Sequence, residues 1–406
     1  SQRAELAQHD ITTLKGLAQL PLPIAFKPSR GTVEALLRVR EQARIQFEQR
    51  EAKARRHEIL PLAAGQGVYR LPEPSKGDVY FDIEGARFVG DQGFEYLLGI
   101  ARWVDDGTLI YEKYLANTPN DERRIFDQFM QRMASILEAH PDMHIYHFHT
   151  YEQSALKRLS GRYALHQDLL DDLLRRESFV DLHQIVRHTL RAGVERYSIK
   201  DLEPYFGYQR EVELRQAGDA RHDLETWLEF NNPMAEAPAD QVEIVVNYNR
   251  DDCLATQGLH AWMEQIRADL IGQGNEIPRP VVEVLVSEEL GDQLQRIRDL
   301  AEKLRINLPE LEDDFSAEHR AMWLLSHLLE FYRREEKAVW WEYFRLDGLA
   351  DEDRLEEKDA IAGLVYVETI SLSKTKIPID RYTFPSQELA IKAGGSLHHA
   401  RLRWGT

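Results

Sequence analysis

The most constraining feature of the sequence is a short apolar run, residues 79–85, that contains two acids. Its residues are strand formers, and Pro74 and Gly77 precede it as breakers. Side chains alternate between the two faces of a strand, so Asp82 and Glu84 leave the same face. Two such carboxylates repel each other and lose hydration. Because oxygen ligands suit Mg²⁺ and Mn²⁺, we expect a divalent cation to compensate; a solvated edge strand is the alternative.

Length, cysteine content and charge limit the class of protein. A chain of 406 residues is too long for one core and predicts about two to four domains. No apolar run approaches the ~20 residues of a membrane span. The single cysteine, Cys253, excludes an internal disulfide and, with no signal peptide, favours a cytoplasmic location. The net charge of −18 argues against a protein that coats nucleic acid along its whole surface, but it permits a local basic patch.

Residues 1–72 form the first predicted segment, which is helical and contains a basic helix that Thr32 can cap. The basic residues of that helix are Arg38, Arg40, Arg44, Arg50, Lys53, Arg55 and Arg56. They predict either a phosphate-contacting face or a solvated helix. Acids in the same segment, Glu41, Glu48, Glu51 and Glu58, favour the solvated helix.

Residues 73–272 form the second predicted segment, a mixed α/β domain that follows a linker at 71–77. Apolar alternation predicts strands at 79–85, 96–103, 109–115 and 143–148. Helical spacing predicts helices at 121–138, 151–159, 180–190, 198–206 and 241–266. Asp106 and Gly107 have the chemistry of a hairpin turn, and Ser198 and Gly207 that of a helix start and stop.

Residues 273–358 are predicted to be an acidic helical connector and residues 359–406 a β-rich piece, with short strands at 363–367 and 382–385. Aromatics alternate with arginines in the connector, at 331–334 and 339–344. Such residues can stack nucleic-acid bases, but they more often form the core of a small helical domain. The final residues show no evident finishing element, so we expect a fragment of a longer chain.

Further acids downstream can join Asp82 and Glu84. Glu152 falls in the first turn of the helix after the strand at 143–148, and Tyr248 and Asp252 lie one helical turn apart on one face. The four acids can therefore converge on one site. A two-metal phosphodiesterase needs such a set, with one cation that activates water and a second that stabilises the leaving oxygen, and Tyr248 would orient the water.

These motifs resemble the three exonuclease motifs of the DEDD family, tyrosine subtype. More closely, residues 71–85, 151–152, 197–203 and 248–253 resemble the ribonuclease-H-like (YprB-type) domains of bacterial RecB-family nuclease–superfamily 1 helicase fusion proteins. The resemblance covers most of the chain and is strongest over 71–262. It implies a ribonuclease-H-like fold, two Mg²⁺ or Mn²⁺ ions, a DNA substrate and a helicase domain in the same full-length chain.

The sequence departs from the wider DEDD pattern in its second motif. The usual Asn falls at His147 or Phe148, and the usual Asp is Glu152, one methylene longer. Asp251 is a competing ligand but points about 100° away around its helix. Asp181 is expected to cap the helix that follows it.

Three histidines, His144, His147 and His149, permit a zinc interpretation. His147 and His149 share a strand face, but no third imidazole or thiolate has a recognisable ligand spacing. A packed or phosphate-contacting pair is therefore the favoured interpretation.

Three functions remain open at this level. The leading hypothesis is a metal-dependent 3′–5′ exonuclease on DNA, in which Tyr248, Asp82, Glu84, Glu152 and Asp252 form the site. A non-cutting scaffold that positions single-stranded DNA for a neighbouring helicase is the rival from another class. A structure-selective endonuclease on the same fold is the third.

Overall fold

The computed structural model describes residues 2–28, 32–281, 288–309, 314–329, 331–372 and 377–394. The chain divides into two compact units. The first comprises Ser1–Glu58, Arg191–Gly193 and Glu330–Thr406, and the second comprises Ile59–Leu190 and Val194–Leu329. The predicted division into four segments stays a prediction.

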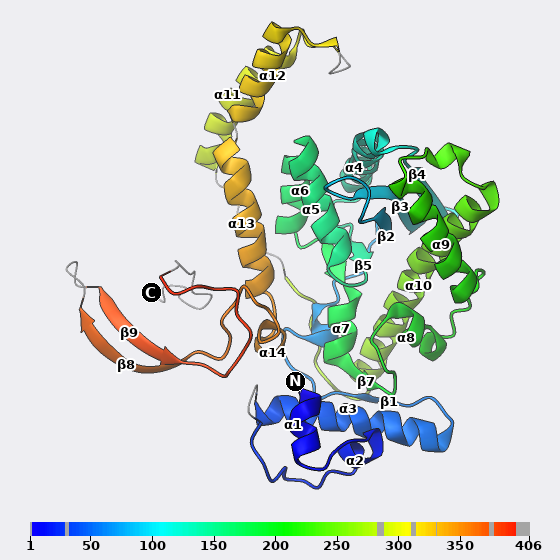
Figure 1. Cartoon of the computed structure of the whole chain (residues 1–406), viewed down its shortest axis with the longest axis vertical. Helices are drawn as coiled ribbons and strands as arrows, with labels where there is room; N and C mark the ends of the chain where they lie inside the picture. The colour runs from blue at the N-terminus through cyan, green and yellow to red at the C-terminus, as the bar shows by residue number, and fades with distance from the viewer. Residues whose placement is uncertain are drawn as a thin grey trace. The chain divides into compact units, whose positions relative to one another are not determined.

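The second unit is built on a five-stranded mixed sheet with the order β4-β3-β2-β5-β6 (Figure 1). The strands are β2 (Val79–Ala86), β3 (Phe94–Trp103), β4 (Leu109–Leu115), β5 (Ile145–His147) and β6 (Phe179–Asp181). β2, β3 and β4 are antiparallel neighbours, whereas β5 runs parallel to β2 and β6 parallel to β5. This arrangement confirms the predicted mixed α/β, ribonuclease-H-like fold.

Helices pack against both faces of this sheet, among them α4 (Glu122–Ala139) and α10 (Ala239–Gly272). The unit also contains α5 (Tyr151–Tyr163), α6 (Gln167–Arg175), α7 (Leu182–Thr189), α8 (Ile199–Phe206) and α9 (Leu214–Glu229). Phe81 stacks on Phe129 of α4, with ring centroids 4.6 Å apart, while its neighbour Tyr80 bonds His260 of α10. Because adjacent side chains of β2 point to opposite faces, α4 and α10 lie on opposite sides of the sheet.

Local sequence signals account for several element ends. Ser198 accepts a hydrogen bond from Asp201 N at the start of α8, and Gly207 ends that helix at φ 75°. Asp181 caps α7 by accepting from His183 N, as expected. The helix predicted at 180–190 was wrong in its first residues, because Val180 belongs to β6. That three-residue strand is too short to show alternation, and its pairing with β5 determines it instead.

The core of the second unit lies between the sheet and these helices. Its largest fully buried side chains include Phe81, Tyr96, Phe126, Phe129 and Tyr146. Burying one large apolar side chain contributes roughly 1.5–3 kcal/mol. The packed core thereby fixes β2 against α10, on which the candidate site is built.

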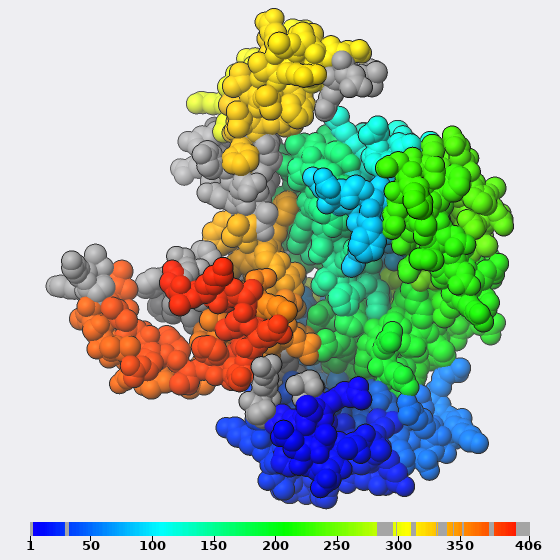
Figure 2. Space-filling view, viewed as in Figure 1, coloured from blue at the N-terminus to red at the C-terminus, as the bar shows by residue number. Residues whose placement is uncertain are grey.

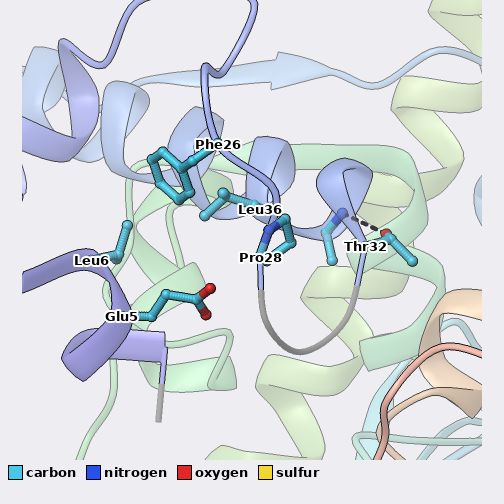
Figure 3. Close-up of a pocket in the computed structure, with 7 residues that line it drawn as sticks. Glu5, Leu6, Phe26, Pro28, Thr32 and Leu36 are labelled. Carbon is cyan, nitrogen blue, oxygen red and sulfur yellow. Dashed lines mark hydrogen bonds between the residues drawn. The ribbon is translucent and has the colours of Figure 1, made fainter. Parts of the chain in front are cut away.

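The first unit begins with three helices, α1 (Gln2–Gln8), α2 (Leu14–Ala18) and α3 (Val33–Ala52), which form one compact group (dark blue in Figure 2). Thr32 caps α3, as predicted, by accepting from Ala35 N at 3.1 Å. A small cavity of about 20 Å³ lies beside this cap, lined by Leu6, Phe26 and Leu36 among others (Figure 3). It has room for little more than a water molecule and is too small for an organic ligand.

The basic helix predicted in this region is α3, and its central arginine is engaged by acids. Arg44 donates to Glu41, Glu48 and Glu58 at 2.7–3.1 Å. Arg56 lies 3.5 Å from Glu48. For these two arginines the structure favours the charge-balanced interpretation over a phosphate-contacting face.

Towards the C-terminus, the second unit also contains α11 (Glu288–Arg305) and α12 (Ala317–Leu328). The first unit also contains α13 (Phe331–Asp347), α14 (Asp351–Arg354) and a hairpin of β8 (Val365–Leu372) with β9 (Pro378–Thr383). Phe331 and Trp340 are half-exposed, so they do not lie in the closed core expected of them. The side chains of 332–338 and of Phe344 lie outside the described part. Among the helices that are described, none has the length and apolar character that a membrane span requires.

Candidate metal centre

Three carboxylates meet on the α10 face of the sheet. Asp82 and Glu84 come from β2 and Asp252 from α10, and one ligand oxygen from each lies within 4.8 Å of the others. Glu84 and Asp252 are buried. A metal ion can be held by acids, histidines or cysteines that lie close together, and among the described residues these three acids form such a group.

A bulge in β3, opposite Glu84 and Gly85 of β2, shapes this edge of the site. Glu84 pairs with Leu97 but Gly85 pairs with Glu95, so Tyr96 is the extra residue. A Cβ atom on Gly85 would lie 2.0 Å from Oε2 of Glu95, a buried acid of β3 that also accepts from the Tyr151 hydroxyl at 2.9 Å. Only glycine fits on β2 opposite this bulge without displacing a neighbour.

The electrostatics of the cluster are those of a site that needs a cation. Burial, followed by the charges of Asp252 and Glu84, raises the pKa of Asp82 well above its ordinary value. Burial and Asp252 raise the pKa of Glu84 to about 8. Close carboxylates with raised pKa values gain from a bound divalent cation, and three oxygen donors suit Mg²⁺ or Mn²⁺. The residues present therefore fit such an ion.

Glu152 lies beside this cluster but outside the group of three. It is buried in the first turn of α5, and its charge is among those that raise the pKa of Asp82. Its Oε2 accepts no hydrogen bond from any described group, and the nearby Nδ1 of His147 is 3.6 Å away. This buried oxygen has a long ion-pair contact with His147 but accepts no hydrogen bond, so a bound cation would stabilise it.

Two cations hold Asp252. Lys200 Nζ donates to its Oδ2 at 2.8 Å, and Arg210 Nη2 donates to its Oδ1. Arg210 also bonds Glu203 through Nε at 2.9 Å. Lys200 comes from α8 and Arg210 from the loop that follows it. These partners offset part of the negative charge of the site.

Tyr248 stands one turn before Asp252 on α10, as its spacing predicts. Lys200 Nζ and the Arg210 guanidinium lie 5.1 and 5.3 Å from its ring centroid. Burial and then Asp252 raise the pKa of its hydroxyl. The hydroxyl therefore keeps its proton at neutral pH and can donate a hydrogen bond.

The competing acids have structural roles. Asp251 is fully buried and accepts from the Tyr208 hydroxyl at 2.8 Å and from Val212 N at 3.1 Å, away from the three-acid group. Asp181, besides capping α7, accepts from His149 N at 2.9 Å. His149 has φ 82°, a left-handed conformation that turns the chain from β5 toward α5.

Histidine ligands for zinc are not assembled. Within the described ranges, none of His144, His147 and His149 belongs to a group of three potential metal ligands. His144 instead bonds Asp78 at 2.9 Å, and His147 bonds the His149 carbonyl at 2.6 Å. The packed interpretation fits His147, which is buried, whereas His149 is exposed.

Sequence reasoning missed four residues that contact the cluster: Lys200, Arg210, Asn249 and Arg221, whose Nη1 lies 3.8 Å from Glu84 Oε2. Asn249 Nδ2 donates to Asp82 Oδ2 at 2.7 Å. Two of them stand in motifs noted above, at 197–203 and 248–253, where a polar residue on the motif face could have been singled out. Arg210 carried no such signal, because a loop brings it to the site.

A comparison with known families gives the class of this domain. Residues 79–264, from β2 to α10, match the family model described as the RNase H superfamily. No curated protein and no solved structure matches the chain. The second unit thus contains a ribonuclease-H-like domain, a class that implies nucleic-acid binding. Together with the acidic cluster, the domain fits a metal-dependent nuclease.

Proposed function

We propose that the chain is a metal-dependent 3′–5′ exonuclease that acts on DNA, with single strands as the preferred substrate. The observation that carries the proposal is the meeting of Asp82, Glu84 and Asp252 within 4.8 Å on the α10 face of a ribonuclease-H-like sheet. The resemblance to DEDD exonucleases supplies the polarity, and that to nuclease–helicase fusions supplies the DNA substrate and a helicase in the same full-length chain.

The acids would hold two ions in this proposal. Asp82, Glu84 and Asp252 would hold the first ion. Glu152, whose Oε2 accepts no hydrogen bond, would help to hold a second. When bound, divalent cations supply Lewis-acid activation of water and of the phosphodiester. The carboxylates themselves orient the site and bring the negative charge that makes it selective for cations.

Tyr248 would orient the attacking water. Its protonated hydroxyl lies on the face of α10 that presents Asp252, and the cations of Lys200 and Arg210 flank its ring. The ammonium of Lys200 keeps its proton because neighbouring carboxylates, Asp252 foremost, outweigh the effect of burial and raise its pKa. A fixed positive charge at this position favours binding of a phosphate group.

A scaffold that binds DNA without cutting it is the second candidate. Two observations favour it: Glu152 lies outside the three-acid group, and Asp252 is already engaged by Lys200 and Arg210. In that case the domain would position a strand for the neighbouring helicase.

The experiment that tests the proposal uses oligonucleotides labelled at either end. The purified chain is incubated with single-stranded DNA, double-stranded DNA and RNA, with Mg²⁺, Mn²⁺ or a chelator. We expect 5′-labelled single-stranded DNA to shorten stepwise from its 3′ end, with no products in the chelator or with Asp82→Ala. Internal cuts would indicate the endonuclease, and binding without cleavage would indicate the scaffold.

A further inference from the structure

Asn249 links the candidate metal site to the edge strand β4 on the same face of the sheet. It is fully buried on α10, three residues before Asp252, and its Nδ2 donates to Asp82 Oδ2 at 2.7 Å. The hydroxyl of Tyr111, on β4, donates to Asn249 Oδ1 at 2.7 Å. A chain of two hydrogen bonds therefore runs from Tyr111 through the amide to Asp82.

The direction of this chain is fixed by the chemistry of its ends. When a cation is bound, Asp82 is an ionised carboxylate that only accepts, so the Asn249 group that faces it must be the NH₂. The amide oxygen is then directed toward Tyr111, whose hydroxyl can donate. With Oδ2 held by the amide, the other oxygen of Asp82 is left for a cation.

Gly99 provides the space for this arrangement. It pairs directly with Asp82 across β2 and β3, and a Cβ atom on it would lie 1.8 Å from Asn249 Oδ1 and 2.8 Å from the Tyr111 hydroxyl oxygen. No other residue fits beneath the amide without moving it. Three adjacent strands and one helix thus contribute to the placement of one carboxylate.

We propose that Asn249 is a positioning residue. Its amide, which accepts a hydrogen bond from Tyr111 and packs against Gly99, holds Asp82 in the orientation required to bind the metal ion. This inference rests on the proposed function, because it assumes that Asp82 is a metal ligand. The hydrogen-bonded partners of metal ligands orient them, and their loss typically costs about 10–100-fold in metal affinity.

The test measures the affinity for Mn²⁺ alone by titration calorimetry, together with the melting temperature of the metal-free protein. Asn249→Leu keeps the branched shape of the side chain but removes both hydrogen bonds, and we expect it to weaken Mn²⁺ binding by about 10–100-fold. Tyr111→Phe removes only the hydrogen bond from Tyr111 to Asn249. We expect it to weaken Mn²⁺ affinity by about two- to tenfold, the contribution of one neutral hydrogen bond. Because Tyr111→Phe leaves the buried Asn249 Oδ1 without this donor, the metal-free melting temperature should fall modestly, and Mn²⁺ affinity is therefore compared at a temperature at which both proteins are folded.

The matched control is Tyr114→Phe. Tyr114 is on the same strand, and its hydroxyl bonds Glu112 at 3.4 Å, away from the cluster, so this variant should bind Mn²⁺ like the parent. If Asn249→Leu does not fold, Tyr111→Phe against Tyr114→Phe decides the question. Parent-like Mn²⁺ affinity in Tyr111→Phe, or in a folded Asn249→Leu, overturns the inference alone. A parent that binds no Mn²⁺ overturns the proposed function and the inference with it.

Discussion

Glu84 is a residue whose raised pKa makes the stability of the metal-free protein depend on pH. Its pKa is raised from an ordinary value of 4.5 to about 8, by burial first and by Asp252 second. The folded, metal-free protein therefore keeps a proton that the unfolded chain has lost. Between these two pH values its stability falls as the pH rises, because the folded state binds the extra proton.

Binding of Mn²⁺ must displace that proton, so the affinity should rise with pH. We expect the dissociation constant to fall by about tenfold per pH unit below about pH 8 for each proton released. Titration calorimetry between about pH 6 and pH 8, in buffers of different ionisation enthalpy, measures both the affinity and the proton release. Glu84→Gln should bind more weakly and release fewer protons; equal release from both proteins would mean that another group titrates.

Tyr248 allows a second test at the residue scale, one that separates chemistry from binding. Tyr248→Phe removes one oxygen and leaves the packing nearly unchanged. If its hydroxyl orients the attacking water, cleavage should slow by ~10²–10⁴-fold. Affinities for Mn²⁺ and DNA should change little, since the effect falls on the transition state. Single-turnover rates and binding isotherms measure the two quantities, and equal cleavage by both proteins would remove Tyr248 from the mechanism.

The bulge of β3 at Tyr96 lies opposite Glu84 and Gly85, at the end of the acidic part of β2. Gly85→Ala would bring a Cβ atom to 2.0 Å from Glu95 Oε2 and 3.1 Å from the Tyr151 hydroxyl. Relieving this clash must move Glu95 or the bulge, and overpacking of this kind typically costs about 1–3 kcal/mol. We expect denaturant unfolding to show such a loss, together with weaker Mn²⁺ binding if Glu84 moves.

The control for this prediction is Gly161→Ala in α5. Its added Cβ meets nothing within 4 Å, and alanine favours a helix more than glycine does, so stability should stay the same or rise. Shortening the opposing acid with Glu95→Ala in the Gly85→Ala background should recover part of the loss. A Gly85→Ala protein as stable as the parent would show that position 85 of β2 tolerates a side chain.

The same elements show why part of the site could be predicted from sequence and part could not. Alternation in β2 placed Asp82 and Glu84 on one face, and helical spacing placed Tyr248 with Asp252, because both patterns are local. Lys200 and Arg210 reach the cluster only through tertiary packing, which leaves no periodic trace. The strand β6 was missed for a similar reason, since three residues that pair with β5 do not establish a period.

At the scale of the whole molecule, the site belongs to one of two compact units. Asp82, Glu84, Glu152 and Asp252 all lie in the second unit, although more than 160 residues separate the first from the last. Calorimetric unfolding of such a chain need not be two-state. Since a metal stabilises only the structure that it binds, its effect should be confined to the transition of the second unit.

Saturating Mn²⁺ should raise the melting temperature of that transition. By mass action a ligand at a hundredfold excess over its dissociation constant adds about 2.7 kcal/mol, and each kcal/mol raises the melting temperature by roughly 2–4 °C for a domain of this size. Scanning calorimetry with and without Mn²⁺ measures the shift. Asp82→Asn combined with Asp252→Asn removes two of the three clustered carboxylates and should abolish it. A double variant that shifts as much as the parent would place the ion elsewhere, and a shift confined to the other transition would place it in the first unit.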